Sequence, residues 1–182
     1  NSSIEENQPL NTKVGSFSSA DEDGDVSFTY ELTPISGDKD KDNGKFTISG
    51  SDLLTNTTLD YEVKSEYSIY VSVRDPGGAS TAKHFIISVE NLNDNKPQFT
   101  ADVYTFNILE NQNTSIVGQV EAIDLDSIQP VSYSITDNYG FFIIDATEAT
   151  LSITDNSALD YERFQQFLIP VHASDGEFTT DA

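Results

Sequence analysis

The tetrapeptide Leu59-Asp60-Tyr61-Glu62 recurs unchanged as Leu159-Asp160-Tyr161-Glu162, one hundred residues further along the chain. Three other acidic markers recur in the same order, at offsets of 100 to 104 residues. One such match can arise by chance, but four matches in register indicate an internal repeat. The other marker pairs are Ile4-Glu5-Glu6-Asn7 with Ile108-Leu109-Glu110-Asn111, Ala20-Asp21-Glu22-Asp23 with Ile123-Asp124-Leu125-Asp126, and Val71-Ser72-Val73-Arg74-Asp75 with Val171-His172-Ala173-Ser174-Asp175.

Apolar and polar residues alternate along several segments of both copies, and no segment keeps a 3.6-residue period. Strict alternation is typical of half-buried strands. Turn signals such as Asp75-Pro76-Gly77-Gly78 separate these segments. Short alternating strands in a unit of this size predict one β-sandwich per copy. The expected strands lie at 26–32, 67–73 and 85–89 in the first copy, and at 104–108 and 167–173 in the second.

The composition is strongly acidic, with 31 Asp and Glu against 9 Lys and Arg, for a formal net charge of −22. This balance argues against binding to nucleic acid or to an anionic membrane surface. There is no Cys, which excludes disulfides, thiolate metal sites and thiol nucleophiles. No apolar run reaches about 18 residues, so we expect no membrane insertion. We also find no signal peptide, and we expect a mature segment or a piece of a longer chain.

The acidic residues stand at the ends of the expected strands, where a sandwich gathers them at its two poles. Glu6 follows the first apolar stretch, while Asp60 and Glu62 precede the strand at 67–73. Clustered carboxylates repel one another by several kcal/mol, and calcium prefers six to eight oxygen ligands. Composition alone leaves a merely solvated acidic surface open, but the spacing favours cation sites.

The segment Asn93-Asp94-Asn95-Lys96-Pro97-Gln98-Phe99 resembles the inter-repeat linker of cadherins. The Glu-Asn, Asp-x-Asp and Leu-Asp-x-Glu motifs resemble the other calcium motifs of that family. The resemblance implies an all-β fold of two tandem seven-stranded Greek-key sandwiches, immunoglobulin-like, with domains at 1–95 and 96–182. We expect the first strand of the first repeat and the last strand of the second to be truncated or disordered.

The resemblance also implies about three calcium ions at the junction of the two repeats. Half-sites facing neighbouring repeats are expected to be weak or empty. Asn91, where the family usually has Asp, and Ser127 after Asp126 depart from the pattern. The implied junction ligands are Glu6, Asp60 and Glu62 from the first repeat, Asn93, Asp94 and Asn95 from the linker, and Asp124, Asp126 and Asp175 from the second repeat. The implied half-sites are Asp21, Asp23 and Asp75 at one end, and Glu110, Asp160 and Glu162 at the other.

Rival chemistries fit the sequence poorly. Read as an EF-hand loop from Asp21, the chain has Leu32 where a bidentate Glu is needed. The acidic loop that contains Asp38, Asp40 and Asp42 fails in the same way, and we expect it to be solvated. A paired-acid glycosidase site would not repeat in both copies. His84 and His172 are expected to face solvent, and we predict no enzymatic activity.

The functional hypothesis is a calcium-binding extracellular rod segment of a cadherin-like adhesion or surface receptor. The alternative is a spacer or a ligand- or glycan-binding module of a large microbial or invertebrate surface protein. Expected partners are another cadherin-like ectodomain, homophilic or heterophilic, and neighbouring repeats of the same chain. We expect an extracellular location, in the ectodomain of a single-pass membrane protein. Glycosylation sequons begin at Asn1, Asn56 and Asn113.

Overall fold

The computed structural model describes residues 3–22, 24, 27–35, 37–111, 115–126 and 128–182. Asn1, Asp23, Val26, Asn113 and Ser127, which the sequence analysis singled out, lie outside these ranges. The chain divides into two compact units, Asn1–Leu92 and Asn93–Ala182. Regular structure in both units is almost entirely β, which confirms the all-β, two-domain prediction. The domain boundary predicted between residues 95 and 96 stays a prediction.

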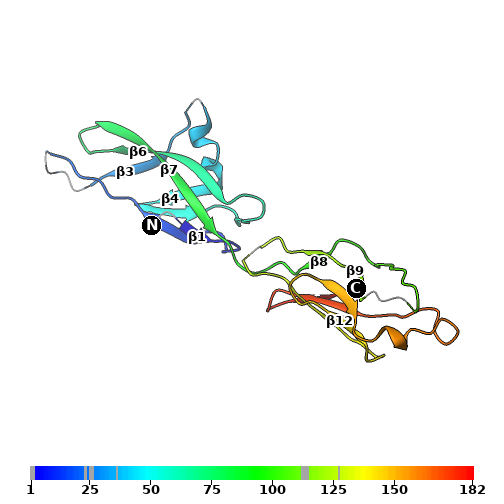
Figure 1. Ribbon diagram of the computed structural model, residues 1–182. Helices are drawn as coiled ribbons and strands as arrows, with labels where there is room; N and C mark the ends of the chain where they lie inside the picture. The colour runs from blue at the N-terminus through cyan, green and yellow to red at the C-terminus, as the bar shows by residue number, and fades with distance from the viewer. Residues whose placement is uncertain (1–2, 23, 25–26, 36, 112–114, 127) are drawn as a thin grey trace. The chain divides into compact units, whose positions relative to one another are not determined.

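Unit 1 contains seven strands within its described residues, as predicted, arranged in two sheets (Figure 1). One sheet has the order β1-β7-β6-β3 and the other the order β2-β5-β4. β1 runs parallel to β7, and the remaining pairs are antiparallel. The bounds are β1 Ser3–Glu5, β2 Lys13–Ser16, β3 Thr29–Leu32, β4 Phe46–Ser49, β5 Asp52–Thr55, β6 Glu66–Arg74 and β7 Ser80–Glu90.

The core of unit 1 lies between these two sheets and is built from alternate positions of their strands. Along β6, Tyr67, Ile69 and Val71 are all buried, and Ile69 is 0% exposed. They pack with Ile87 and Val89 of β7. The alternation seen in the sequence therefore marks the core face of the long β6–β7 hairpin.

Unit 2 contains shorter strands, paired as β10-β8, β11-β14-β15 and β12-β13-β9. The strand expected at 104–108 is not formed, and the strand expected at 167–173 is limited to β14. Alternation gives a segment an apolar face, but a strand also needs a hydrogen-bonded neighbour. The bounds are β8 Gln98–Phe99, β9 Ile116–Gln119, β10 Ala122–Ile123, β11 Ser132–Ile135, β12 Phe142–Ile144, β13 Thr150–Ile153, β14 Val171–Ser174 and β15 Thr179–Asp181.

The buried residues of unit 2 form two clusters rather than one. Val120, Tyr133 and Ala173 belong to the first cluster, and Phe142 and Leu151 belong to the second. Phe106 packs against both clusters. Its ring lies so close to Gly118 that a Cβ there would come within 2.3 Å of ring carbons, so this close contact requires glycine.

The acidic loop of unit 1 is not simply solvated, and the prediction for Asp42 is wrong. Asp42 is 6% exposed, forms an ion pair with Lys64 and accepts a 2.6 Å hydrogen bond from the Ser68 amide. It precedes the short 3-10 turn η2, Asn43–Lys45, which follows η1, Asp38–Asp40. The buried carboxylate therefore fastens this loop to β6.

The two histidine side chains also make polar contacts with other residues, whereas the sequence predicted that they only face solvent. His84 Nε2 lies 2.8 Å from the Ser68 hydroxyl. His172 is 28% exposed and lies 2.7 Å from Asp181 through Nδ1, with Thr136 at 2.9 Å from Nε2. Both histidines therefore lie in cross-strand polar contacts.

Candidate metal centre

Glu6 forms the buried centre of an acidic pole in unit 1. It follows β1 directly and is 0% exposed. Its Oε2 accepts a 2.7 Å hydrogen bond from the Tyr61 amide, and its Oε1 accepts a 2.8 Å bond from the Leu92 amide. Asn7 takes the left-handed conformation, with φ of 59°, which Asn tolerates better than most residues. This turn immediately after Glu6 explains the Glu-Asn pair.

Asp60 and Glu62 complete this pole from the loop before β6. One carboxylate oxygen from each of Glu6, Asp60 and Glu62 lies within 4.8 Å of the others. Asp60 Oδ1 also accepts a 2.9 Å bond from the Val63 amide, which holds the turn. At this separation each pair of ionised carboxylates repels by about 3 kcal/mol at an effective dielectric of about 20. The pole therefore concentrates negative charge at a fixed place.

The corresponding pole of unit 2 repeats the carboxylate cluster and two of its amide hydrogen bonds. Glu110, Asp160 and Glu162 also present carboxylate oxygens within 4.8 Å of one another. The Tyr161 amide donates to Glu110 Oε2 at 2.8 Å, and the Arg163 amide donates to Asp160 Oδ1 at 3.1 Å. Glu110 is only half-buried, in contrast to Glu6. The duplicated motifs thus build duplicated sites, with different degrees of burial.

A second acidic set opens unit 2, and Asn95 organises it. The Asn95 amide donates to Asp126 Oδ2 at 2.8 Å. The Asn95 side chain donates to Asp94 Oδ1 and to Asp126 Oδ1, both at 2.8 Å. Asp126 is 3% exposed, and Asn93, two residues before Asn95, is half-buried. The predicted linker residues and Asp126 are therefore brought together within this unit.

Asp124 lies in the electric field of Asp126 and Asp175. The Asp126 amide donates to Asp124 Oδ1 at 3.0 Å. Burial and the neighbouring charges of Asp126 and Asp175 raise the pKa of Asp124. Burial by itself raises the pKa of Asp175 as well, but hydrogen bonds from the Phe178 and Glu177 amides outweigh it and lower that pKa. Like charges are thus held close together.

The donor set of these clusters suits a hard divalent cation. Their side chains offer carboxylate and amide oxygens, which calcium prefers. Within the described part of the chain, neither Glu6 nor Asp60 is paired with a Lys, Arg or His side chain. Asp175 is 2% exposed, and among the described residues no Lys, Arg or His side chain forms an ion pair with it. A buried carboxylate without a cationic partner is costly, so the residues present fit a bound cation.

The remaining predicted ligands that the structure describes do not assemble into such a cluster. Asp75 caps the β6–β7 turn and accepts a 2.9 Å bond from the Ala79 amide. Asp21 is half-buried, and Asp23 lies outside the described residues. Among the residues that are described, neither Asp21 nor Asp75 belongs to a group of three candidate ligands.

The backbone amides of Tyr61 and Leu92, which orient Glu6, were not predicted from the sequence. A sequence motif specifies side chains. Which backbone amides donate to those side chains depends on how the chain folds. The repeated Tyr after Leu-Asp, at Tyr61 and Tyr161, is the signal that marks one of these two donors.

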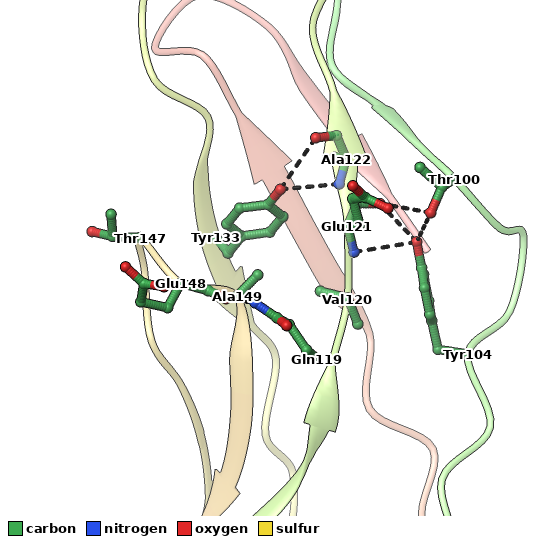
Figure 2. A pocket seen from close by; sticks show the side chains of 10 residues that line it. All are labelled: Thr100, Tyr104, Gln119, Val120, Glu121, Ala122, Tyr133, Thr147, Glu148 and Ala149. Atoms are coloured by element: carbon green, nitrogen blue, oxygen red, sulfur yellow. Dashed lines mark hydrogen bonds between the residues drawn. The ribbon is translucent and has the colours of Figure 1, made fainter.

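A surface hollow of about 530 Å³ in unit 2 is a poor candidate for catalysis (Figure 2). The Tyr104 hydroxyl donates to the Glu121 carbonyl at 2.7 Å, and the Tyr133 hydroxyl lies between the amide and carbonyl of Ala122. These polar groups of the lining therefore bind the chain itself, and the 100–104 segment is fastened to Glu121, directly before β10. No helix in the described ranges has the length and apolar character needed to cross a membrane.

Comparison with known proteins agrees with this duplicated architecture. The sequence profile described as "Cadherin domain" matches residues 1–90 and 104–181. The chain is 32% identical to Cadherin-87A of Drosophila melanogaster over 163 residues, which is 81% of this chain and 8% of that protein. It is 32% identical to Protocadherin Fat 4 of Mus musculus over 180 residues, which is 95% of this chain and 4% of that protein. The chain therefore spans a small part of these relatives.

Solved structures share the fold. The crystal structure of chicken VE-cadherin EC1-2 superposes with a TM-score of 0.71 and 23% identity, covering 98% of this chain and 93% of that one. The structure of PcdhgB3 EC1-4 gives a TM-score of 0.79 at 22% identity, covering 99% of this chain and 46% of that one.

Proposed function

This chain belongs to the cadherin family, and from that premise we propose that it is a calcium-binding segment of an extracellular adhesion or surface receptor. Its two domains form part of the ectodomain of a longer membrane protein. Its partners are other ectodomains of the same family. Its role is to support the ectodomain mechanically and to bind partner ectodomains, rather than to catalyse a reaction.

The observation that carries this proposal is the duplicated acidic pole. A fully buried carboxylate, Glu6, lies within 4.8 Å of two further carboxylates, and the same set recurs around Glu110. A solvated acidic surface requires neither burial nor repetition of this kind. A cation site requires both proximity and oxygen donors.

Calcium would act here by neutralising charge that the fold itself concentrates. Glu6 accepts a hydrogen bond from Leu92, so it holds the last residue of unit 1. The next three residues, Asn93–Asn95, belong to the acidic set of unit 2. Three residues span at most about 10 Å. We propose that calcium is bound by oxygens of both sets and fixes the angle between the domains.

The proposed junction site consists of the nine ligands that the sequence implies. Glu6, Asp60 and Glu62 supply carboxylates from unit 1, and Asp124, Asp126 and Asp175 supply them from unit 2. Asn93, Asp94 and Asn95 supply oxygens from the linker. About three ions would balance this charge. The pole at Glu110, Asp160 and Glu162 offers only one domain's ligands and would bind calcium more weakly.

Calcium titration by calorimetry tests this proposal on the intact chain. We expect binding in the range of about 10⁻⁴–10⁻³ M, typical of extracellular modules. Glu6→Gln should weaken the tightest site about tenfold or more, because it removes a ligand charge. Glu110→Gln is the matched control and should leave that site unchanged. Equal effects of both substitutions, or no calcium binding, would contradict the proposal.

A further inference from the structure

The sequon Asn56-Thr57-Thr58 is the one of the three sequons whose asparagine lies within the described residues. Asn56 follows β5 directly, and both Asn56 and Thr58 are exposed. An asparagine, any residue except proline, and a hydroxyl residue form the acceptor motif for N-linked glycans. A bulky glycan needs a surface position, and both the asparagine and the hydroxyl residue of this motif occupy one.

The main chain at Asn56 is held by its neighbours, although its side chain stays at the surface. Its backbone amide donates to the Lys45 carbonyl at 2.8 Å, one residue beyond the last paired position of β4 and β5, Phe46↔Thr55. Thr55, directly before it, is 1% exposed, and its hydroxyl donates to the Pro9 carbonyl at 3.1 Å. The motif therefore begins at a fixed point of unit 1.

The side-chain amide of Asn56 is compatible with an attached sugar. Its Nδ2 donates a 3.2 Å hydrogen bond to the Gly44 carbonyl. A primary amide carries two hydrogens, and glycosylation replaces one of them, so the other remains for Gly44. A Cβ added at Gly44 would meet no atom within 4 Å apart from its chain neighbours, so open space lies beside this residue. The first sugar therefore does not require Asn56 to give up this contact.

Unit 2 has an asparagine at the same place in the repeat but lacks the acceptor motif there. Asn156 follows Asn56 by 100 residues, and Ala158 stands where the hydroxyl residue would be needed. Asn156 is half-buried, and its Oδ1 is buried. Exposure and motif thus change together between the two copies, and they coincide in unit 1.

We propose that Asn56 carries an N-linked oligosaccharide that covers the start of β4, an outer strand of the sheet β2-β5-β4. In the modification, the bond between the anomeric carbon of the first sugar and a lipid-linked pyrophosphate breaks. That carbon bonds to Nδ2, and one Nδ2 hydrogen leaves as a proton. The inference rests on the proposed extracellular function, because this sugar donor acts on secreted chains.

A glycan at this place has a consequence for the sheet. An outer strand presents unpaired main-chain groups on which another chain can add a strand. A hydrated oligosaccharide at the start of β4 would exclude such a chain from that side of unit 1.

The test secretes the intact chain from animal cells behind an added signal peptide, and mass spectrometry measures the occupancy of Asn56. We expect most molecules to carry a glycan at Asn56. Thr58→Val keeps Asn56 and its contact with Gly44 but removes the hydroxyl, and it should abolish the glycan. Thr58→Ser is the matched control and should retain it. Asn56→Gln is less informative, because it also removes the hydrogen bond to Gly44.

Amide NMR locates the sugar on the surface. After enzymatic trimming to a single N-acetylglucosamine, the parent and Thr58→Val should differ at the amides of Gly44, Lys45 and Phe46, in addition to the residues next to position 58. Amides of unit 2 should be unchanged.

An unmodified Asn56 in the secreted chain, or a glycan that persists in Thr58→Val, would overturn the assignment. A glycan at Asn56 that leaves the Gly44 and Lys45 amides unchanged would overturn its placement at β4. Calcium titration of the same secreted protein tests the proposed function separately. Calcium binding without a glycan would count against this inference alone, and a glycan without calcium binding would count against the metal sites alone.

Discussion

At the scale of single residues, Glu6 and Glu110 occupy equivalent positions but differ in burial and in the number of amide hydrogen bonds that they accept. Glu6 is fully buried and satisfies two amides, whereas Glu110 is half-buried and accepts one amide bond from Tyr161. Leaving a buried donor unsatisfied costs about 1–3 kcal/mol. We therefore expect Glu6→Ala to destabilise unit 1 by about 2–5 kcal/mol, and Glu110→Ala to destabilise unit 2 by less. Urea unfolding in saturating calcium, where repulsion among the carboxylates is neutralised, measures both when amide exchange is followed in each unit.

Asp137 gives unit 2 a dependence on pH that involves no metal ligand. Burial acts to raise its pKa, but hydrogen bonds from the Tyr139 and Phe142 amides, at 2.7 and 2.8 Å, lower it below the usual value. A lowered folded-state pKa adds stability above the unfolded value of 3.8, and this stability is lost as pH falls through the folded-state pKa.

The matching experiment compares Asp137→Asn with the parent chain by thermal unfolding from pH 7 down to pH 2. We expect the variant to be less stable at pH 7 by about 1–3 kcal/mol, and the difference to shrink as the parent is acidified. A difference that stays constant with pH would show that the carboxylate charge is unimportant.

Residue types and spacing sufficed to predict that the carboxylates of Glu6, Asp60 and Glu62 lie close together, because both copies of the repeat carry the same three motifs. Their role as metal ligands stays a prediction. Residue types and spacing did not suffice for Asp42. In the sequence it is the third acid of an Asp-Lys alternation, but its burial depends on a contact with Lys64, 22 residues away. Contacts of this range leave no local pattern.

At the scale of elements, β6 and its counterpart around β14 share the alternation of apolar and polar residues but differ in how deeply the apolar side chains are buried. Truncating a fully buried Ile to Ala costs about 2–5 kcal/mol. Ile69→Ala should therefore destabilise unit 1 by that amount, whereas Ile169→Ala, at a half-buried position, should cost unit 2 clearly less. Denaturation of each variant, resolved by amide exchange, gives the two values. Equal losses would mean that Ile169 is as well packed as Ile69.

The same comparison shows why strand prediction succeeded at β6 and failed at 104–108. Both segments alternate, and Phe106 and Ile108 do direct their side chains into the core clusters. Tyr104 is also fastened, through Glu121. A strand additionally needs a neighbour that accepts and donates main-chain hydrogen bonds, and no local sequence contains that information.

At the scale of the whole molecule, the repeat predicted the two-domain architecture directly, since four markers in register require two similar folds. Some of the acidic residues behind the net charge of −22 belong to these markers and lie in the carboxylate clusters. How the two units act together stays a proposal, because it depends on bound ions as well as on the chain.

The most direct test of the proposed junction is small-angle X-ray scattering of the chelated protein during calcium titration, with magnesium at equal concentration as the control. Magnesium is smaller and demands stricter octahedral geometry, so it should have little effect. We predict that calcium lowers flexibility and gives a more extended, rod-like profile, and that Asp94→Ala abolishes this change. A profile that is identical with calcium, magnesium and chelator would contradict a calcium-rigidified junction.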